Sequence, residues 1–224
     1  MTASTASLAD RNSSPQRTTT VAGGFLSPAK HGETEFTERG SRFIGNCAPV
    51  SGEQEAKFFV SSVREKYPGA SHTVFAYRLQ NGASRLSDDG EPSGTAGSPV
   101  FEVLTRRDVV NAVITVTRYF GGTLLGAGGL IRAYAKAAAA ALDAAGTAEM
   151  RPWRKGEVTV PYPLYEKAAR LLDETGGRDV EVLFKADVKI WFSIPAEGWA
   201  AMAEGFRELT AGSAEPVETG EFYG

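Results

Sequence analysis

The sequence predicts an α/β protein made of two domains, and three features of the chain support this fold class. Runs of alternating apolar and polar residues, typical of strands, alternate with segments of helical periodicity along most of the 224 residues. Hydrophobic residues make up 42% of the chain and charged residues 23%, as in an ordinary globular protein. A polar stretch at residues 149–156 interrupts the pattern and is expected to act as a linker.

Residues 1–24 consist mostly of Ser, Thr, Ala and Gly. Such a segment buries too little apolar surface to offset the entropy cost of ordering it, so a disordered tail is predicted. Order is expected from Phe25 on. The elements expected in the first domain, residues 25–148, are a hairpin over 34–50, helices over 52–67, 98–107 and 130–145, and strands over 72–79 and 109–120.

Turn and capping signals place the first elements. Glu38, Arg39 and Gly40 separate two extended runs and form the expected turn of the hairpin. Ser51 and Gln54 form a capping-box pattern at the start of the first helix, and a Pro-Gly pair ends it. The strand that follows alternates apolar and polar side chains.

Residues 80–98 contain several glycines and Pro92 and are predicted to form a long loop. Compact domains seldom keep such a loop without a use for it. Pro99 then fits the first turn of a short helix. In the strand over 109–120 the even-numbered positions are mainly apolar and the odd-numbered ones half polar. Helices are therefore expected on one face of the sheet, with the other face partly open.

The segment after the linker has the element order of a ferredoxin-like domain. Its expected order, βαββαβ, occupies residues 157–224. The elements are strands over 157–160, 180–184, 188–194 and 214–219 and helices over 164–175 and 196–209. Trp191, Phe192 and Trp199 lie on a strand and a helix that should pack together, so we assign them to the core.

The charge and cysteine content exclude several classes of protein. Residues 25–150 carry 13 basic and 13 acidic side chains, and residues 151–224 carry 9 basic and 13 acidic ones. A protein held to nucleic acid by bulk charge would be basic, so any such contact has to use a local patch. Cys47 is the only cysteine, which excludes an internal disulfide and a multi-cysteine zinc site. With no long apolar run and no signal peptide, a cytoplasmic location without membrane contact is expected.

The stretch 118–134, RYFGGTLLGAGGLIRAY, is the strongest candidate for a binding site. Two pairs of glycines, with a fifth between them, join a strand to an alanine-rich helix. A helix start presents free backbone N–H groups and a partial positive charge, and glycines let a ligand approach the backbone. The residues expected to bind phosphate or nucleic acid are Arg118, Tyr119, Gly121, Gly122, Gly128, Gly129 and Arg132.

Two common nucleotide motifs are excluded for this loop. The dinucleotide pattern G-x-G-x-x-G is met only formally, since no series of βαβ units follows it, and the Lys-Ser/Thr pair of a P-loop is absent. The glycines also suit tight packing of a helix on a sheet, which stays the alternative explanation. Tyr119, Phe120 and Tyr134 offer ring faces for stacking on bases, with core packing as the alternative.

A second set of reactive side chains lies in the 80–98 loop and on the strand before it. Asp88, Asp89 and Glu91 are close in sequence, and clustered carboxylates hold Mg²⁺ together with substrate phosphates. The alternative is a turn whose charges face water. If the protein is an enzyme, these carboxylates and His72, as general acid or base, are the expected catalytic residues, and Mg²⁺ is the expected cofactor. If the protein is not an enzyme, neither catalytic residues nor a cofactor is expected.

Five motifs occur in order along the first domain: SRFIG (41–45), SHTVFAYRL (71–79), SDDGEPSGTAG (87–97), RYFGG (118–122) and LGAGGLIRAY (125–134). Together they closely resemble the IMPACT family, which includes bacterial YigZ-type proteins. The resemblance covers residues 25–146. Residues 157–224 are similar, by pattern, to the smaller C-terminal domain of bacterial members.

The resemblance implies a fold and a setting. It implies an N-terminal α/β domain like that of a small-subunit ribosomal protein and of domain IV of elongation factor G. The C-terminal ferredoxin-like domain is expected to resemble domain V of that factor. Eukaryotic relatives modulate translational control under amino-acid starvation by binding an activator of a stress-responsive kinase. No activity is carried over to this chain, because a fold does not define a function.

Three hypotheses of function follow. The leading one is a non-catalytic, translation-associated regulator or binding protein that contacts the ribosome or structured RNA through the glycine-rich loop, with the acidic second domain facing a protein partner. The first alternative is a Mg²⁺-dependent enzyme acting on a phosphorylated small molecule or nucleotide, which requires the 80–98 loop to fold over the 121–129 loop. The second alternative is a protein-interaction module in stress-linked translational control.

Overall fold

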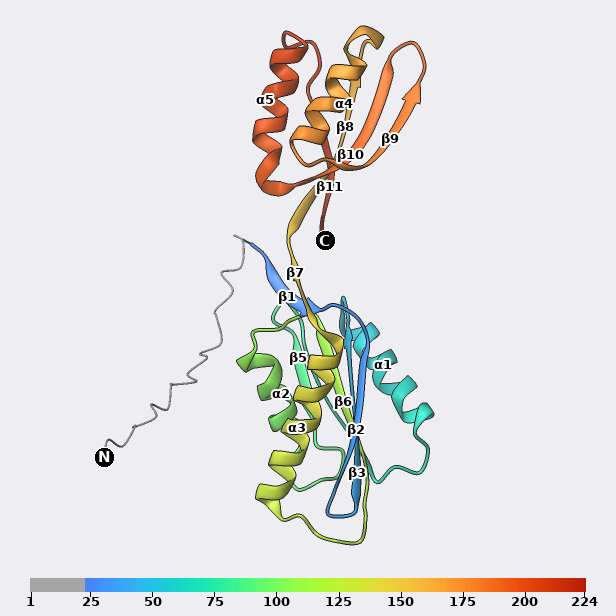
Figure 1. Cartoon of the computed structure of the whole chain (residues 1–224), viewed down its shortest axis with the longest axis vertical. Coiled ribbons are helices and arrows are strands. Elements are labelled where there is room, and N and C mark those ends of the chain that lie inside the picture. Colours follow the sequence, from blue (N-terminus) through green and yellow to red (C-terminus); the bar gives the residue numbers. More distant parts are fainter. Residues whose placement is uncertain (1–22) are drawn as a thin grey trace, which may run out of the picture.

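The structure is a computed structural model that describes residues 23–224 (Figure 1). The tail predicted for residues 1–24 therefore lies almost wholly outside the described residues. The described part contains five α-helices and three β-sheets, which confirms the mixed α/β class. Between residues 23 and 224 no helix is long and apolar enough to cross a membrane.

The larger sheet has five antiparallel strands in the order β2-β3-β6-β4-β5. The strands are β2 (Gly32–Glu38), β3 (Ser41–Pro49), β6 (Ala112–Tyr119), β4 (His72–Arg78) and β5 (Ser84–Ser87). The β2–β3 pair confirms the predicted hairpin. Strand β5 corrects the prediction of a continuous loop over 80–98, because this short edge strand is held by pairing with β4 and has little apolar patterning of its own.

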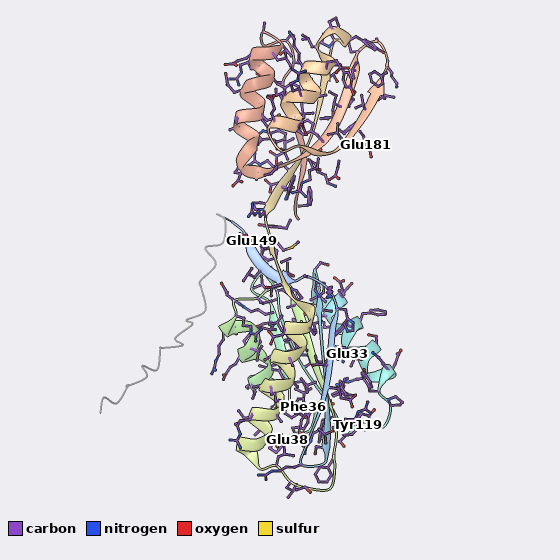
Figure 2. The ribbon with its side chains drawn as sticks, viewed as in Figure 1. Glu33, Phe36, Glu38, Tyr119, Glu149 and Glu181 are labelled. Carbon is purple, nitrogen blue, oxygen red and sulfur yellow. The ribbon has the colours of Figure 1, made fainter. Side chains whose placement is uncertain are left out.

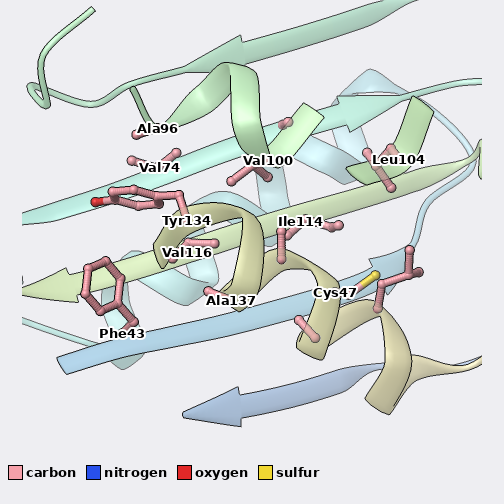
Figure 3. Close-up of a cluster of buried hydrophobic side chains, with 14 of the residues drawn as sticks. Phe43, Cys47, Val74, Ala96, Val100, Leu104, Ile114, Val116, Tyr134 and Ala137 are labelled. Carbon is pink, nitrogen blue, oxygen red and sulfur yellow. The ribbon is translucent and has the colours of Figure 1, made fainter. Parts of the chain in front are cut away.

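Helices cover both faces of this sheet, and not one face as the alternation of β6 predicted. Helices α2 (Gly97–Arg106) and α3 (Ala127–Ala145) pack on one face, where Figure 3 shows the apolar cluster that they share with the sheet. Helix α1 (Glu53–Lys66) packs on the other face, against Val113 and its neighbours. The odd-numbered threonines of β6 are also fully buried, since a threonine presents a methyl group as well as a hydroxyl.

Two local features of this half bear on the predictions. The capping box of α1 is shifted by one residue, because the backbone N–H and the Oγ of Ser51 donate to Glu55 Oε2 at 2.7 and 2.8 Å, and Gln54 takes no part. Cys47 lies fully buried between α3 and the sheet (Figure 3). Burial raises the pKa of its thiol to about 12, as expected of a core residue with no chemical role.

The polar segment predicted as a linker, residues 149–156, lies within two successive strands. Strand β7 (Thr147–Met150) pairs antiparallel with β1 (Phe25–Pro28), and β8 (Pro152–Val160) follows directly. Figure 1 shows this two-stranded ribbon between the two larger sheets. The strand character of this segment was not predicted, because the pairing partner of β7, β1, lies more than a hundred residues earlier in the chain. Local composition does not show such a pairing.

The C-terminal sheet has the order β11-β8-β10-β9, with two helices on one face. Its further elements are η1 (Tyr162–Leu164), α4 (Tyr165–Glu174), β9 (Arg178–Phe184), β10 (Val188–Pro195), η2 (Ala196–Gly198), α5 (Trp199–Leu209) and β11 (Val217–Tyr223). This arrangement confirms the ferredoxin-like βαββαβ plan. Phe192 and Trp199 belong to the core as predicted, whereas Trp191 is only half-buried and donates to Glu157 Oε2.

Candidate nucleic-acid interface

The start of α3 is an uncapped helix N-terminus. Gly126, with φ +71°, stands at the N-cap position, and no side chain of residues 23–224 caps the first turn. The first N–H to be satisfied within the helix is that of Leu130, which donates to the carbonyl of Gly126 at 2.9 Å. The backbone N–H groups of residues 127–129 are therefore free to bind an external acceptor.

The glycines of the loop differ in whether a side chain could be accommodated at their positions. A Cβ at Gly121 would lie 1.9 Å from the carbonyl carbon of Gly40, so this residue packs against the β2–β3 turn. A Cβ at Gly129 would meet Leu125 at 2.9 Å. Gly128 has no such neighbour, since the nearest atom, Arg132 Nη1, would lie at 3.6 Å. Packing therefore accounts for Gly121 and Gly129 and leaves Gly128 without a structural reason.

One side of this helix start faces a hollow of about 230 Å³, here called the cationic groove. The residues that line it are Glu38, Arg39, Leu125, Gly129, Arg132, Ala133 and Lys136. Figure 2 shows Glu38 and Phe36 on the hairpin beside α3. Arg39 and Arg132 form no ion pair within residues 23–224, and Lys136 Nζ lies only over the ring of Phe36, at 4.3 Å from its centroid. The cationic groove is thus lined by three cationic side chains and one acidic side chain.

Sequence reasoning found Arg132 and missed Arg39 and Lys136. Lys136 follows Arg132 by four residues and so lies on the same face of α3, which is a signal that helical spacing could have given. Arg39 comes from the hairpin turn, and only the contact between β2 and α3 brings it to the groove.

Arg118 is not available to an external phosphate, which corrects its predicted role. Its side chain is only 5% exposed, and Nη1 donates to Glu91 Oε1 at 2.6 Å. Nη2 donates to Ser41 Oγ at 3.1 Å. The guanidinium lies between the rings of Phe43 and Phe120, at 5.5 and 5.4 Å from their centroids. Arg118 is thus a buried cation that joins β6 to the 80–98 segment.

Glu91 is the centre of this buried polar cluster. Its Oε1 also accepts a hydrogen bond from Tyr134 Oη at 2.7 Å, and His72 Nε2 lies 3.8 Å from the same oxygen. Burial and the hydrogen bond to Glu91 raise the pKa of Tyr134, so this phenol stays protonated. The ring of His72 is oriented by Asp89, whose backbone carbonyl lies 2.8 Å from Nδ1. Since a carbonyl only accepts, Nδ1 carries the proton.

The cluster forms the floor of a second hollow, of about 380 Å³, here called the apolar pocket. Its lining residues are His72, Glu91, Pro92, Arg118, Phe120, Leu124, Leu125, Gly126, Ala127 and Leu130. Leu124 is 81% exposed and Phe120 is 47% exposed. Leu125 lines both the apolar pocket and the cationic groove, so the two hollows flank the first turn of α3.

The two aspartates of the 80–98 segment accept hydrogen bonds that stabilise the fold, and they do not form a common site with Glu91. Asp88 Oδ1 accepts from the backbone N–H groups of Ala96 and Gly97 at 3.0 and 2.8 Å, and Oδ2 from Gly94 at 2.9 Å. Burial by itself would raise the pKa of Asp88, but these three donors hold it below its ordinary value.

Asp89 likewise has its own partners. Its Oδ2 accepts from the backbone N–H of Thr73 at 2.7 Å and its Oδ1 from Arg64 Nη2 at 2.9 Å. Within the described residues no three acidic, histidine or cysteine side chains could hold a metal ion together. The predicted Mg²⁺ site of Asp88, Asp89 and Glu91 is therefore wrong, because the three carboxylates point to different partners.

Of the remaining predicted residues, Tyr119 is half-buried. Its Oη donates to the carbonyl of Pro68 at 3.2 Å, and the guanidinium of Arg42 lies 5.5 Å from its ring centroid. Gly122, with φ +82°, forms part of the exposed turn after β6. Neither residue lines the cationic groove or the apolar pocket. Their predicted contact with phosphate stays a prediction.

Comparison with known proteins identifies the family. Residues 39–142 match the family model of the Impact N-terminal domain. The chain is 36% identical to the IMPACT family member YvyE of Bacillus subtilis over 199 residues, which are 88% of this chain and 91% of that protein. The chain belongs to the IMPACT family. It is also 33% identical to the family member YigZ of Escherichia coli, over 77% of this chain and 87% of that protein.

Other relatives share a smaller part. The human protein IMPACT is 33% identical over 108 residues, which are 45% of this chain and 33% of that protein. A solved structure described as the crystal structure of a hypothetical protein is 30% identical, with a TM-score of 0.62 over 88% of this chain and 98% of that one. The family range 39–142 contains every residue that lines the apolar pocket and, except Glu38, the cationic groove.

Proposed function

We propose that this IMPACT family protein is a non-catalytic, translation-associated binding protein that contacts ribosomal or other structured RNA at the cationic groove. Family membership, which extends to the mammalian and yeast proteins, fits a regulatory role in translation. The observation that carries the RNA contact is the cationic groove itself, in which Arg39, Arg132 and Lys136 gather beside a helix start.

The electrostatics of the groove favour phosphate over other ligands. Three cations against Glu38 leave a local positive excess, although residues 25–150 as a whole are neutral. The free N–H groups of residues 127–129 and the dipole of the 19-residue helix α3 add to the attraction for an anion. Such contacts bind the backbone of RNA and carry no sequence information.

The charge of the C-terminal domain suggests that the two domains bind different partners. Residues 151–224 carry an excess of acidic side chains, which repels phosphate. We assign this half to a protein partner, and the cationic groove of the other half to RNA.

Co-sedimentation with ribosomes at several salt concentrations tests the proposal. The full-length chain is expected to associate at low salt and to lose affinity steeply as salt rises, because counterions are released from the RNA. The double variant Arg132→Gln, Lys136→Gln should reduce the slope of log affinity against log salt by about one unit for each phosphate that the variant no longer neutralises.

A matched control removes the same charge elsewhere. Lys57 and Arg85 line a hollow on the α1 face of the sheet, so Lys57→Gln with Arg85→Gln should leave the association and its salt slope unchanged. The proposal fails if the wild-type chain does not associate at low salt, or if the control variant weakens association as much as the groove variant. Association that is insensitive to salt and to both variants favours the protein-interaction module instead.

A further inference from the structure

We propose that the apolar pocket takes up one unstacked base of RNA, of the kind that carries an exocyclic amino group, while the adjoining phosphates lie in the cationic groove. This inference rests on the proposed function and adds the chemical class of nucleotide that the interface selects. Three properties of the pocket carry it: its position, its walls and the hydrogen-bonding character of its floor.

The position suits a nucleotide because the two hollows are neighbours. Leu125 lines both of them, and the first turn of α3 separates them. A phosphate held by Arg132 and the N–H groups of residues 127–129 would place its own base on the other side of this turn. A nucleotide combines these two chemistries, an anion joined to a flat apolar ring, and the interface offers a place for each.

The walls suit a flat ring. They are formed by Phe120, Leu124, Leu125 and Leu130, and the volume of about 380 Å³ lies in the range of small-molecule sites. One face of Phe120 meets the guanidinium of Arg118, yet the side chain remains 47% exposed. Recognition of single-stranded RNA uses aromatic rings of this kind, on which a splayed-out base stacks.

The floor of the pocket offers a hydrogen-bond acceptor, the carboxylate of Glu91. Glu91 uses Oε1 for Arg118 and Tyr134, whereas Oε2 has no hydrogen-bond partner among residues 23–224, although the side chain is only 4% exposed. A carboxylate oxygen without a partner in the described part of the chain can only accept, so the pocket favours a ligand that donates a hydrogen bond.

This polarity distinguishes the bases. The amino group of cytosine donates to a carboxylate, which is a known pairing of Glu with this base. Uracil has the same ring size but presents a carbonyl oxygen at that position, and this oxygen would face the Glu91 carboxylate. The pocket should therefore favour cytosine over uracil, while the groove treats the two nucleotides alike.

The test is the binding of fluorescent nine-residue oligo(C) and oligo(U) to the full-length chain at low salt. The two probes have the same length and charge, so their phosphate contacts cancel in the ratio of affinities. Oligo(C) is expected to bind about tenfold tighter, as is typical when one base-specific hydrogen-bond set is lost. The variant Ala127→Trp should reduce this ratio to about one, because Ala127 is an exposed residue at the rim of the pocket and the larger ring fills it.

Arg132→Gln provides the opposite control. It should weaken both probes equally and leave the ratio unchanged, since it acts on phosphate alone. Equal binding of the two probes to the wild-type chain overturns the base pocket and leaves the phosphate contact intact. A tenfold ratio that survives Ala127→Trp also overturns it, because the selection then lies elsewhere. If neither probe binds while ribosomes still co-sediment, the pocket is refuted and the proposed function stands; if ribosomes also fail to bind, both are refuted.

Discussion

Two helices in the same half of the molecule start after glycine-rich segments, and their N-termini are used in opposite ways. At α2 the chain supplies its own anion, since Asp88 accepts hydrogen bonds from Gly94, Ala96 and Gly97. At α3 no side chain in the described part of the chain takes this place, and cations line the groove beside it. The first helix start is closed by the protein, and the second is left open.

The difference shows that a glycine-rich loop before a helix does not by itself identify a ligand site. The physical question is whether the free N–H groups of the first turn already have an acceptor within the chain. In SDDGEPSGTAG the acceptor, Asp88, precedes the helix by several residues, and the last acid, Glu91, is tied to β6 and α3 through Arg118 and Tyr134. In FGGTLLGAGG no acid is present at all.

The largest expected effect concerns the buried ion pair of Arg118 and Glu91. Arg118→Met removes one partner of a buried ion pair and leaves the Glu91 carboxylate uncompensated, so unfolding free energy should fall by about 3–5 kcal/mol. Urea unfolding of the purified chain measures this loss, with the midpoint of the transition as the readout.

Arg132, beside the open helix start of α3, supplies the control for this measurement. Arg132→Met removes an arginine that is exposed and has no ion pair among the described residues, so stability should change by less than about 0.5 kcal/mol. If the two variants lose similar amounts of stability, the contrast between a structural and an available arginine does not hold.

A smaller effect is expected at the closed helix start itself. Asp88→Ala leaves three backbone N–H groups without their acceptor and should cost about 2 kcal/mol near neutral pH. Because the folded state lowers the pKa of Asp88, its contribution is present above the ordinary pKa of 3.8 and is lost as pH falls below that value.

Urea unfolding of the wild-type and Asp88→Ala chains at a series of pH values checks this sign. The difference in stability should be constant from about pH 7 down to pH 5 and should narrow as pH falls below about 4. A difference that grows toward low pH would show that the protonated form of Asp88 is the stabilising one.

Much of the fold could be predicted from the sequence because its elements have strong local signals. The βαββαβ order, the hairpin turn and the helix ends all follow from periodicity, turn residues and a glycine at the end of α3, Gly146. Most of the failures were non-local. The ribbon of β1 and β7 depends on a distant pairing partner, and α1 covers a sheet face whose polar threonines are typical of an exposed face. Strand β5 pairs with its neighbour β4 but has little apolar patterning of its own.

The site was predicted less completely than the fold, for a related reason. The sequence indicates that a cation and a helix start lie near each other, but it does not show what each charge meets. Arg118 and Arg132 flank the same loop, yet one faces inward from β6 to Glu91 and the other faces outward from α3. Arg39 reaches the groove only through the packing of the hairpin on α3.

The smallest expected effect separates two glycines of the open helix start. Gly126→Ala should lower stability by about 1 kcal/mol, since its φ of +71° is strained for a residue with a Cβ even though the space around it is empty. Gly128→Ala should raise stability by about 0.5–1 kcal/mol, because alanine suits a helix better and its Cβ would meet only Arg132 Nη1, at 3.6 Å.

A glycine that costs stability at an exposed helix start is expected to serve close approach of a ligand. The Gly128→Ala chain, although more stable, should therefore bind ribosomes more weakly than the wild-type chain when the two are compared by co-sedimentation at the same low salt concentration. Gly128 lies in the first turn of α3 between Ala127, which lines the apolar pocket, and Gly129, which lines the cationic groove. A methyl group there would hold a phosphate away from the free N–H groups of this turn. Full association of the stabilised variant would mean that the ligand does not touch the backbone of α3, and the open helix start would then contribute only its long-range field.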